Sequence, residues 1–527
     1  MKHKTLLFLA GLIFTCVAVN AQTQTIFQVA TGGNSDDETS VMIITKDKGF
    51  IVGGTTYSGI SGEKTDSSRG SSDMWIVKYN SSGSIEWQKT LGGNNKDYCE
   101  DIQQTKDGGY IVGGYSLSGI SGDKTVSSKG DYDYWIIKLD ASGAIQWQKS
   151  FGGSFTDILS SVRQTKDGGY ILGGYSSSIV SGDKTAPNYG GFDYWIVKID
   201  SAGNKLWDKS YGGTDWDDLF DLELTSDGGY ILGGSSYSYT HAPNAQDYWL
   251  VKTDKNGVVQ WSQNYGGTSS DNLAKVKQTA DGGYILGGSS LSDISGDKTS
   301  HNLGGDDYWI VKTNATGNIE WDKTIGGNNW EELHDIKQTS DKGYIVTGGS
   351  SSGISGDKTE NSRGYYDYWT IKLDSNSNIQ WDKTIGGSDD DIATSVSEAG
   401  SGNYLITGYS ASGKNWEKKS VSRGSNDYWT VLLRNTAGSI ATGNLTTSIT
   451  NTLVSVLPNP ATNNLRIEHL PTGKTNISVV DLSGLVKLHA ATTNSSYNLN
   501  ISSLKAGNYI LKLETGKTVV SRHFIKE

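Results

Sequence analysis

One recurring segment constrains the fold of this chain more than any other feature. Its second copy reads QTKDGGYIVGGYSLSGISGDKTVSSKGDYDYWIIKLDASGAIQWQKSFGG, and related copies precede and follow it. One tryptophan per copy marks the period, at Trp75, Trp135, Trp195, Trp249, Trp309, Trp369 and Trp429. The interval between these tryptophans is constant except from Trp195 to Trp249, where it is shorter because the fourth copy lacks the SGDKT segment. Seven copies predict seven equivalent structural units.

Each copy divides into four short extended segments. In the second copy these are residues 101–105, 110–116, 134–139 and 144–149, which are rich in Ile, Val, Tyr and Trp. The intervening DGG and DASG segments are typical of tight hairpin turns, because glycine adopts positive φ at no steric cost. The pattern predicts a four-stranded antiparallel meander in each copy. We therefore expect an all-β fold, a seven-bladed β-propeller with one copy per blade.

The last blade needs a strand that its own copy does not supply. A second tryptophan follows each of the first six at a fixed distance, at Trp87, Trp147, Trp207, Trp261, Trp321 and Trp381, and the seventh copy has none. Phe27 precedes Trp87 by one full period of the repeat, and the following Gly32 and Gly33 match Gly92 and Gly93. We expect this N-terminal strand to complete the last blade and to remove an open sheet edge. Both tryptophan series are predicted to form the core between blades.

The N-terminus has the composition of a secretory signal peptide over residues 1–21. Lys2 and Lys4 precede an apolar run from Leu6 to Val19, and Val19-Asn20-Ala21 forms a small-residue cleavage site. Removal of this segment leaves Cys99 as the remaining cysteine of the chain, which excludes an intramolecular disulfide. No other stretch is long and apolar enough to be a membrane-spanning helix.

Composition and charge narrow the classes of fold and partner. With 68 Gly, 5 Pro and 10% aromatic residues in 527, the chain matches a turn-rich β protein and neither a disordered chain nor a helical bundle. The formal charge of the chain is −11. Residues 22–450 carry −17, while residues 1–21 and 451–527 are positive. Such an acidic body argues against nucleic acid and anionic lipid surfaces as partners. Cations, neutral glycans and proteins remain.

The turn before each second tryptophan carries a family resemblance. Gly143 followed four residues later by Trp147 resembles the tryptophan-docking repeat of quinoprotein-like propellers. The resemblance implies the propeller fold. Ser377 replaces the glycine in the sixth copy, and the adjacent cysteines and eight blades common in that class are missing from the sequence. We therefore expect no quinone, and no other cofactor.

The tail is a separate unit. After a propeller over residues 22–438 and a linker over 439–453, residues 454–527 lose the tryptophan repeat and read as short alternating strands, which predicts a small β-sandwich. The tail resembles the type A C-terminal sorting domain of type IX secretion substrates of the Bacteroidota, through Pro458, Asn459, Pro460, Ala461, Asp481, Leu482, Ser483, Gly484, Gly507, Asn508, Tyr509 and Lys526. Leu457 stands where that family often has tyrosine. The resemblance implies export to the periplasm by the signal peptide, then outer-membrane passage by the type IX machinery to a secreted or surface location.

A series of acids marks the connections between successive blades. Two glycines, three residues and an acid recur, the acids being Asp37, Asp97, Asp157, Asp217, Asp271, Glu331 and Asp391. If the first strand of each blade is innermost, these carboxylates ring the mouth of the central channel. Each can accept backbone N–H bonds in its own turn. The alternative is a ring that binds a ligand or a cation such as Ca²⁺, although seven blades make the ring too wide for one ion.

Aromatic residues that break the repeat are the second group of candidate site residues. They are Phe155, Trp216 and Trp330 between blades, Trp416 in the loop of the seventh copy, and Tyr237 and Tyr239 in the shortened loop of the fourth. Exposed aromatics beside carboxylates and amides form platforms for sugars or peptides. The alternative interpretation is local packing of the loops.

The sequence carries no convincing catalytic motif. Residues 349–353 read GSSSG, yet no helix pattern follows them, and His241, His301, His334 and His469 lack metal-site spacing. We therefore expect a secreted or cell-surface binding protein for glycan or protein rather than an enzyme, with no metal site. Two alternatives stay open: a polysaccharide hydrolase or lyase that uses loop-face carboxylates, and a purely structural surface component.

Overall fold

The computed structural model describes residues 23–400, 402–435, 455–458, 460–470, 473–481, 485–515 and 518–527. The predicted signal peptide over 1–21 and the predicted linker over 439–453 lie outside these residues. All elements described are β-strands, which confirms the all-β prediction. Within these ranges, no helix is long and apolar enough to cross a membrane.

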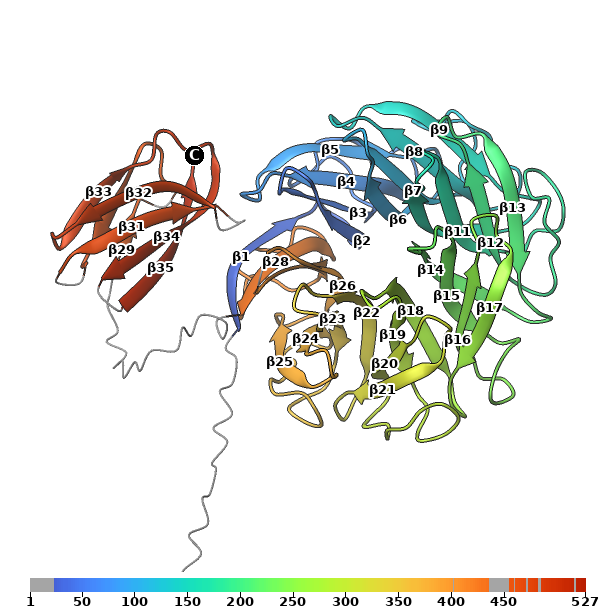
Figure 1. The fold of residues 1–527 in the computed structure, drawn as a ribbon. Helices are drawn as coiled ribbons and strands as arrows, with labels where there is room; N and C mark the ends of the chain where they lie inside the picture. The colour runs from blue at the N-terminus through green and yellow to red at the C-terminus, as the bar shows by residue number, and fades with distance from the viewer. Residues whose placement is uncertain are drawn as a thin grey trace, which may run out of the picture.

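Residues 23–435 form seven four-stranded antiparallel sheets that stand around a common centre (Figure 1). The innermost strands are β2 (Asp37–Ile44), β6 (Asp97–Gln104), β10 (Asp157–Gln164), β14 (Asp217–Leu224), β18 (Asp271–Gln278), β22 (Glu331–Gln338) and β26 (Asp391–Glu398). The second strands are β3 (Phe50–Thr56), β7 (Tyr110–Ser116), β11 (Tyr170–Ser176), β15 (Tyr230–Ser236), β19 (Tyr284–Ser290), β23 (Tyr344–Ser350) and β27 (Asn403–Ser410). These are the propeller-like units that the repeat predicts.

The two remaining positions of each sheet follow in chain order. The third strands are β4 (Asp73–Tyr79), β8 (Asp133–Leu139), β12 (Asp193–Ile199), β16 (Asp247–Thr253), β20 (Asp307–Thr313), β24 (Asp367–Leu373) and β28 (Asp427–Asn435). The outermost strands of six sheets are β5 (Ile85–Leu91), β9 (Ile145–Phe151), β13 (Lys205–Tyr211), β17 (Val259–Tyr265), β21 (Ile319–Ile325) and β25 (Ile379–Ile385). The outermost strand of the seventh sheet is β1 (Thr23–Thr31), which comes from the N-terminus.

The pairing of β1 with β28 agrees with the spacing of Phe27. The two strands are antiparallel, and Phe27 lies opposite Leu432. The seventh sheet also packs on the first, because the Thr39 and Thr394 hydroxyl oxygens lie 2.9 Å apart. The first and last sheets of the array therefore contact each other, and the hydrogen bonds of β1 cover the edge of β28.

Tyrosine hydroxyls join the sheets around the ring. In six sheets, the tyrosine that precedes the first-series tryptophan donates to a tryptophan carbonyl of the next sheet at 2.9–3.2 Å: Tyr134 to Trp195, Tyr194 to Trp249, Tyr248 to Trp309, Tyr308 to Trp369, Tyr368 to Trp429 and Tyr428 to Trp75. These tryptophans are 0–5% exposed. The first-series tryptophans are therefore core residues between sheets, as predicted.

The second tryptophan series is less buried than predicted. Trp381 is 5% exposed, but the other five are half-buried. Each packs against a tyrosine of the next sheet at centroid distances of 5.5–6.4 Å: Trp87 on Tyr110, Trp147 on Tyr170, Trp207 on Tyr230, Trp261 on Tyr284, Trp321 on Tyr344 and Trp381 on Tyr404. The physical reason is their place on the outermost strands, which have no neighbour on one side.

The C-terminal residues form two further sheets. One contains β29 (Ser455–Leu457), β30 (Asn464–Glu468) and β33 (Ser496–Asn500), and the other β31 (Thr475–Val480), β32 (Val486–Thr492), β34 (Gly507–Thr515) and β35 (Thr518–Lys526). Buried residues of both sheets, among them Leu465, Ile467, Leu511 and Phe524, share one core. This is the small β-sandwich that the alternating pattern predicts.

Candidate functional site

The seven acids at the connections between sheets are buried in their own turns. Asp37, Asp97, Asp157, Asp217, Asp271, Glu331 and Asp391 are all 0% exposed. Each accepts the backbone N–H of the second glycine of its turn, at 2.6–2.8 Å. Within the described ranges no group of three or more His, Cys, Asp or Glu side chains is placed to hold a metal ion. These carboxylates are therefore turn acceptors, the first of the two roles that the sequence suggests for them.

The chemistry of these turns explains why the acid recurs in every copy. Asp157 accepts from the Gly153 N–H at 2.7 Å and from the Ser178 hydroxyl at 2.9 Å, so that it ties two loops together. Burial raises the pKa of this carboxyl, and the hydrogen bonds oppose that rise. The carboxyl group therefore serves its own turn and is closed to a ligand from the channel.

The channel itself is lined by a different set of residues, at one position of the repeat. Every innermost strand has a β-bulge after its third residue, and the bulge leaves the fourth residue without a partner across the ladder. These seven residues line a central cavity of about 590 Å³, and they are Ser40, Glu100, Ser160, Phe220, Ala274, His334 and Thr394. The repeat thus places seven side chains of six kinds around one axis.

A glycine of the repeat permits this bulge. A Cβ on Gly174, in the second strand β11, would lie 2.0 Å from the carbonyl oxygen of Ile158 in β10. The second strand can approach the bulged backbone only where that atom is missing. The glycine at this position is therefore a requirement of the channel wall, and it is kept as Gly408 where Thr407 replaces its neighbour.

One side of the cavity is an aromatic wall. Phe220 and Tyr175 line the cavity with their ring centroids 6.2 Å apart. Phe192 packs edge-on against Tyr175 at 5.2 Å, and Trp216 packs edge-on against Phe192 at 5.6 Å. Trp216 is 53% exposed, so the run of rings leads from the surface into the channel. Tyr115, which also lines the cavity, extends the wall to a neighbouring sheet through Tyr98 and Tyr132.

The other side of the cavity is polar and mostly acidic. The Tyr366 hydroxyl donates to Glu332 at 3.3 Å, while a buried oxygen of Asp306, Oδ1, has no hydrogen-bond partner among the described residues. Burial, and then the charge of Glu332, raises the pKa of Asp306 to about 6. Burial lowers the pKa of His334, against the opposing effect of Glu332. The wall therefore presents carboxyl groups beside a histidine whose neutral form is favoured.

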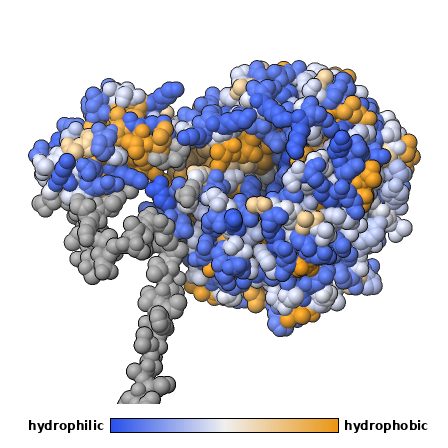
Figure 2. Space-filling view, viewed as in Figure 1, coloured by the Kyte–Doolittle hydropathy of each residue, from blue (hydrophilic) through white to orange (hydrophobic). Residues whose placement is uncertain are grey.

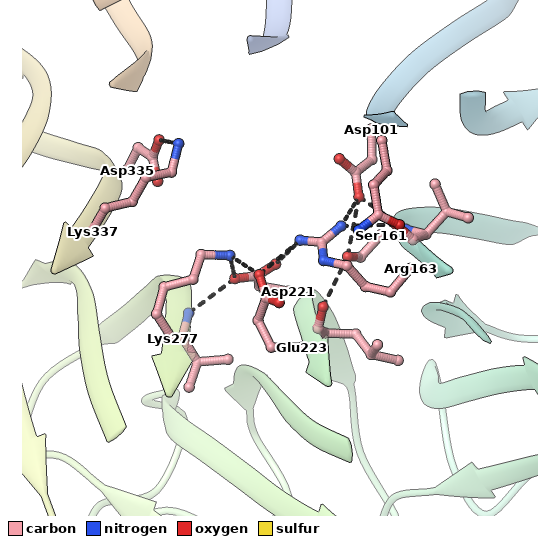
Figure 3. A network of polar contacts seen from close by, with 12 residues as sticks. Asp101, Ser161, Arg163, Asp221, Glu223, Lys277, Asp335 and Lys337 are labelled. Carbon is pink, nitrogen blue, oxygen red and sulfur yellow. Dashed lines mark hydrogen bonds and ion pairs between the residues drawn. The ribbon is translucent and has the colours of Figure 1, made fainter. Parts of the chain in front are cut away.

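A network of ion pairs lies deeper along the same innermost strands (Figure 3). The Arg163 guanidinium contacts Asp101, Asp221 at 3.3 Å and Glu223 at 3.0 Å. Lys277 contacts the same Asp221 carboxylate at 2.8 Å and also contacts Glu223. Charged side chains thus join the neighbouring strands β6, β10, β14 and β18 along the channel wall, whereas the aromatic wall lies toward the loops.

Three of the predicted aromatic candidates stand apart from the cavity. Phe155 and Trp330 are 49% and 43% exposed on connections between sheets, and Trp330 lies over Gly305, where a Cβ would approach its ring within 2.7 Å. Trp416 is 65% exposed, and the Arg363 guanidinium lies 5.8 Å from the centre of its ring. None of these three aromatics lines the central cavity. Trp216 does not line the cavity either, but ring contacts through Phe192 connect it to the lining residue Tyr175.

The two tyrosines of the shortened loop differ in role. Tyr239 packs on Trp249 at 4.8 Å, and its hydroxyl donates to the Gly212 carbonyl at 3.1 Å. In four other sheets a lysine stands over the equivalent tryptophan, as Lys184 does over Trp195 at 5.4 Å. Tyr239 therefore fills the place of the lysine lost with the SGDKT segment and is a packing residue, while Tyr237 is 37% exposed.

A second cavity lies at the seam between the last sheet and the first. It measures about 310 Å³, and Phe50, Leu405 and Leu432 contribute apolar walls. Leu432 occupies the position where other sheets have a buried lysine, such as Lys138, paired with the hairpin aspartate Asp107 at 2.9 Å. This cavity reflects the missing ion pair and brings together few polar groups.

The described residues that carry the resemblance of the tail differ in their burial. Tyr509 is 5% exposed in the core, and Lys526, at the end of β35, is 8% exposed and bridges to Ala461. Gly507 begins β34 with a φ of 151°, and Pro458 and Pro460 are exposed. Asn459 lies outside the described residues.

Residues 455–527 match the family described as the secretion system C-terminal sorting domain. This chain carries a type IX secretion sorting domain.

The remaining comparisons find distant similarity and assign no function. The regulatory protein FlaEY of Caulobacter vibrioides is 25% identical over 222 residues, which are 37% of this chain and 23% of that protein. The chain thus spans less than a quarter of that relative's length.

Similar solved structures include BBS1N in complex with ARL6DN, with a TM-score of 0.43, 8% identity, and 81% of this chain and 99% of that chain covered. Puromycin hydrolase has a TM-score of 0.41 at 10% identity, with 72% and 51% covered. A variant of the Synechocystis apocarotenoid oxygenase has a TM-score of 0.36 at 10% identity, with 79% and 94% covered. At such scores these likenesses assign neither ligand nor activity to this chain.

The sequence contained a signal for the channel residues that the search for loop aromatics missed. The fourth position of the innermost strand varies from copy to copy as Ser, Glu, Ser, Phe, Ala, His and Thr, while the flanking positions repeat more closely. A position that varies between the copies of an internal repeat does not make the packing contact that keeps the other positions alike. Alignment of the seven copies would have shown this variation, but not the bulge that turns the position into the channel.

Proposed function

We propose that this secreted or outer-surface protein is a binding module whose ligand enters the mouth of the central channel. In this proposal the chain comprises a signal peptide over 1–21, a seven-bladed propeller over 22–438 closed by its N-terminal strand, a linker over 439–453 and the sorting domain over 454–527. The seven sheets and the pairing of β1 with β28 support the propeller. The sorting domain supports export by the type IX machinery, which is the expected partner of the tail.

The aromatic run from Trp216 to Phe220 is the observation that carries the binding proposal. The tryptophans of the two repeated series pack between sheets, because every sheet needs the same contact. This run occurs on one side of the channel, leads inward from an exposed ring and ends at the cavity. Figure 2 shows, on the face in view, a largely hydrophilic surface with apolar side chains in separate patches. A concave site with aromatic walls is therefore the best-formed candidate.

The lining favours a glycan or a peptide segment as ligand. Aromatic faces pack against sugar rings and apolar side chains, and the serine, asparagine and carboxyl groups opposite them offer hydrogen bonds. The cavity of about 590 Å³ falls within the usual range for small-ligand sites. No cofactor enters this proposal.

Ligand screening of the mature full-length chain tests the proposal. Glycan and peptide arrays would identify a ligand, and Trp216→Ala and Phe220→Ala should each weaken its binding by about 1–3 kcal/mol, the range for loss of a packed aromatic anchor. Leu206→Ala is the matched control, because Leu206 is 56% exposed on the outermost strand β13. Binding that survives both aromatic substitutions unchanged would place the ligand elsewhere, and Trp330→Ala and Trp416→Ala would then test the outer loops.

A carboxyl pair supports one alternative, a hydrolase or lyase acting on polysaccharide. Asp306 and Glu332 line the same cavity, and the pKa of Asp306 is raised to about 6, by burial and then by the charge of Glu332. A carboxyl group whose raised pKa lets it keep a proton up to about pH 6, beside a second carboxyl group, is the arrangement of a general acid and its partner. Release of sugar ends by the wild-type chain, lost in Glu332→Gln, would establish the enzyme; ligand binding without turnover would favour the binding module.

A further inference from the structure

We propose that the channel mouth binds an organic cation, an ammonium or guanidinium group, presented by a lysine or arginine side chain of a peptide or by a free amine. This inference rests on the proposed function, because it names the chemical class of ligand for the same cavity. It is carried by a cavity of about 590 Å³ whose lining combines aromatic rings with carboxyl groups.

The aromatic wall offers rings that such a cation can contact. Tyr115, Tyr175 and Phe220 line the cavity together. A cation held near an aromatic ring is attracted by the negative face of the π-system, and several rings on one wall add their contributions. The chain uses this interaction internally, because Lys358 stands 5.0 Å from the ring centre of Trp369.

The lining of the cavity carries more negative than positive groups. Glu100, Asp306 and Glu332 line the cavity, and Lys275 is the single lysine or arginine among its lining residues. Glu100 makes neither a hydrogen bond nor an ion pair with another described residue. Burial raises its pKa, and the charge of Lys275 opposes that rise. Asp306 Oδ1 is buried without a hydrogen-bond partner in the same part of the chain. A cationic ligand would satisfy these oxygens.

Repeated acids elsewhere in the described ring already have partners. The acids at the starts of the innermost strands accept backbone N–H groups, as Asp157 does from Gly153 at 2.7 Å. The hairpin acids pair with buried lysines, as Asp227 does with Lys252 at 2.8 Å. One oxygen of such a scaffold acid can stay buried without a partner, as Asp157 Oδ1 does, but its other oxygen is hydrogen-bonded. No side-chain hydrogen bond or ion pair holds Glu100 or Asp306 among the described residues, and in this the two cavity acids differ from the scaffold acids. The charge of −17 over residues 22–450 adds a long-range attraction for cations.

The ion-pair network sets the depth to which a cation can enter. Arg163 and Lys277 stand between Asp101, Asp221 and Glu223 beyond the cavity, as Figure 3 shows. The three carboxylates of this network already hold two cationic side chains of the chain itself, so a ligand cation would have to compete with Arg163 and Lys277 for them. The ligand is therefore expected to enter end-on, with one charged group in the mouth and the rest of the molecule outside.

Calorimetric titration of the mature full-length chain with matched probes tests the inference. The probes are Nα-acetyl-lysine methylamide, its neutral isostere Nα-acetyl-norleucine methylamide, a lysine-containing peptide and spermidine, at pH 8, where Asp306, with a pKa of about 6, is ionised. We expect the lysine probe to bind at least about tenfold more tightly than the norleucine probe. Binding of the peptide or of spermidine supports the cation site, and their relative affinities separate the two sources.

Substitutions locate the cation within the cavity. Glu332→Gln and Asp306→Asn should each weaken binding of the lysine probe by about tenfold, because each removes a charge that faces the ligand. Glu514→Gln in the sorting domain is the control and should leave binding unchanged. Equal binding of the lysine and norleucine probes, no binding of the lysine probe, or binding unaffected by both acid substitutions would each overturn the inference. If a neutral ligand found by screening still depends on Trp216 and Phe220, the proposed function stands while the cation inference fails.

Discussion

The ion-pair network in the channel allows a quantitative test through Arg163→Met. The Arg163 side chain is 13% exposed, and its guanidinium contacts three carboxylates. Of these, Asp221 is 1% exposed. Replacement by methionine keeps much of the apolar stem but removes the charge. Asp101 then loses its cation, and Asp221 and Glu223 share the remaining Lys277.

The expected cost follows from this geometry. Removal of one partner of a buried ion pair typically costs about 3–5 kcal/mol, because the other charge stays buried without compensation. Asp101 keeps the Val162 N–H at 2.9 Å, and Lys277 still contacts the other two carboxylates, which places the effect near the lower limit. We expect a loss of about 3 kcal/mol in the free energy of unfolding at pH 7. Lys166→Met, an exposed lysine on the following hairpin, should change it by less than about 0.5 kcal/mol.

Urea denaturation at several pH values separates the charge effect from lost packing. Burial opposes ionisation of Asp221, but the charges of Lys277, Lys275 and Arg163 hold its pKa below the usual value of 3.8. A depressed folded-state pKa contributes stability above the unfolded value, and that contribution disappears as the pH falls through the folded value. The deficit of Arg163→Met should therefore shrink below about pH 4. A deficit under about 1 kcal/mol at pH 7, or one equal at pH 7 and pH 3, would refute the electrostatic account.

Four further predictions follow from the fold. Deletion of residues 22–33 should lower the melting temperature of the whole ring, because the seventh sheet loses β1 and the edge of β28 is exposed; an unchanged melting curve would contradict the closure. Trp135→Ala should cost about 3–5 kcal/mol in urea denaturation without altering ligand specificity, since this 0% exposed indole would leave a cavity between sheets; a cost below about 1 kcal/mol would argue against its core role. Burial opposes ionisation of Asp107, but hydrogen bonds from Thr105 and Lys138 lower its pKa to about 2. Asp107→Asn should therefore be less stable than wild type at pH 7, and the difference should vanish between pH 4 and 2. A pH-independent difference would exclude this ion pair as the cause. Removal of residues 455–527 should leave the protein in the periplasm on cell fractionation, and normal surface display of that variant would contradict the sorting role.

Much of the fold could be predicted because it depends on local and repeated demands. The DGG turns, the alternating strands and the regular spacing of tryptophans are properties of each copy, and they are sufficient to define four strands per sheet. The pairing of β1 with β28 was also predictable, since Phe27 continues the register of the second tryptophan series. Burial of that series was overestimated, because a sequence does not show that an outermost strand lacks a neighbour.

The candidate site was predicted in part. Trp216 was identified as an aromatic that breaks the repeat, and it lies at the outer end of the channel wall. Tyr239 was identified by the same criterion, yet it packs on Trp249 in place of a missing lysine. Loss of symmetry in a sequence therefore selects both ligand-facing residues and residues that repair a local deletion, and tertiary contacts are needed to separate them.

The sequence by itself determined the number of copies, the strands within each copy, the partner of the N-terminal strand and the sorting tail, because these depend on spacing and on turn chemistry along the chain. The tertiary structure decided where the charges and rings point. The same run of seven acids could have faced the channel or their own turns, and backbone N–H groups 2.6–2.8 Å away hold them in the turns. A β-bulge in each innermost strand turns the following residue, such as Phe220 or His334, into the channel instead. A bulge depends on how closely two strands approach in space, and that distance is set by packing around the whole ring.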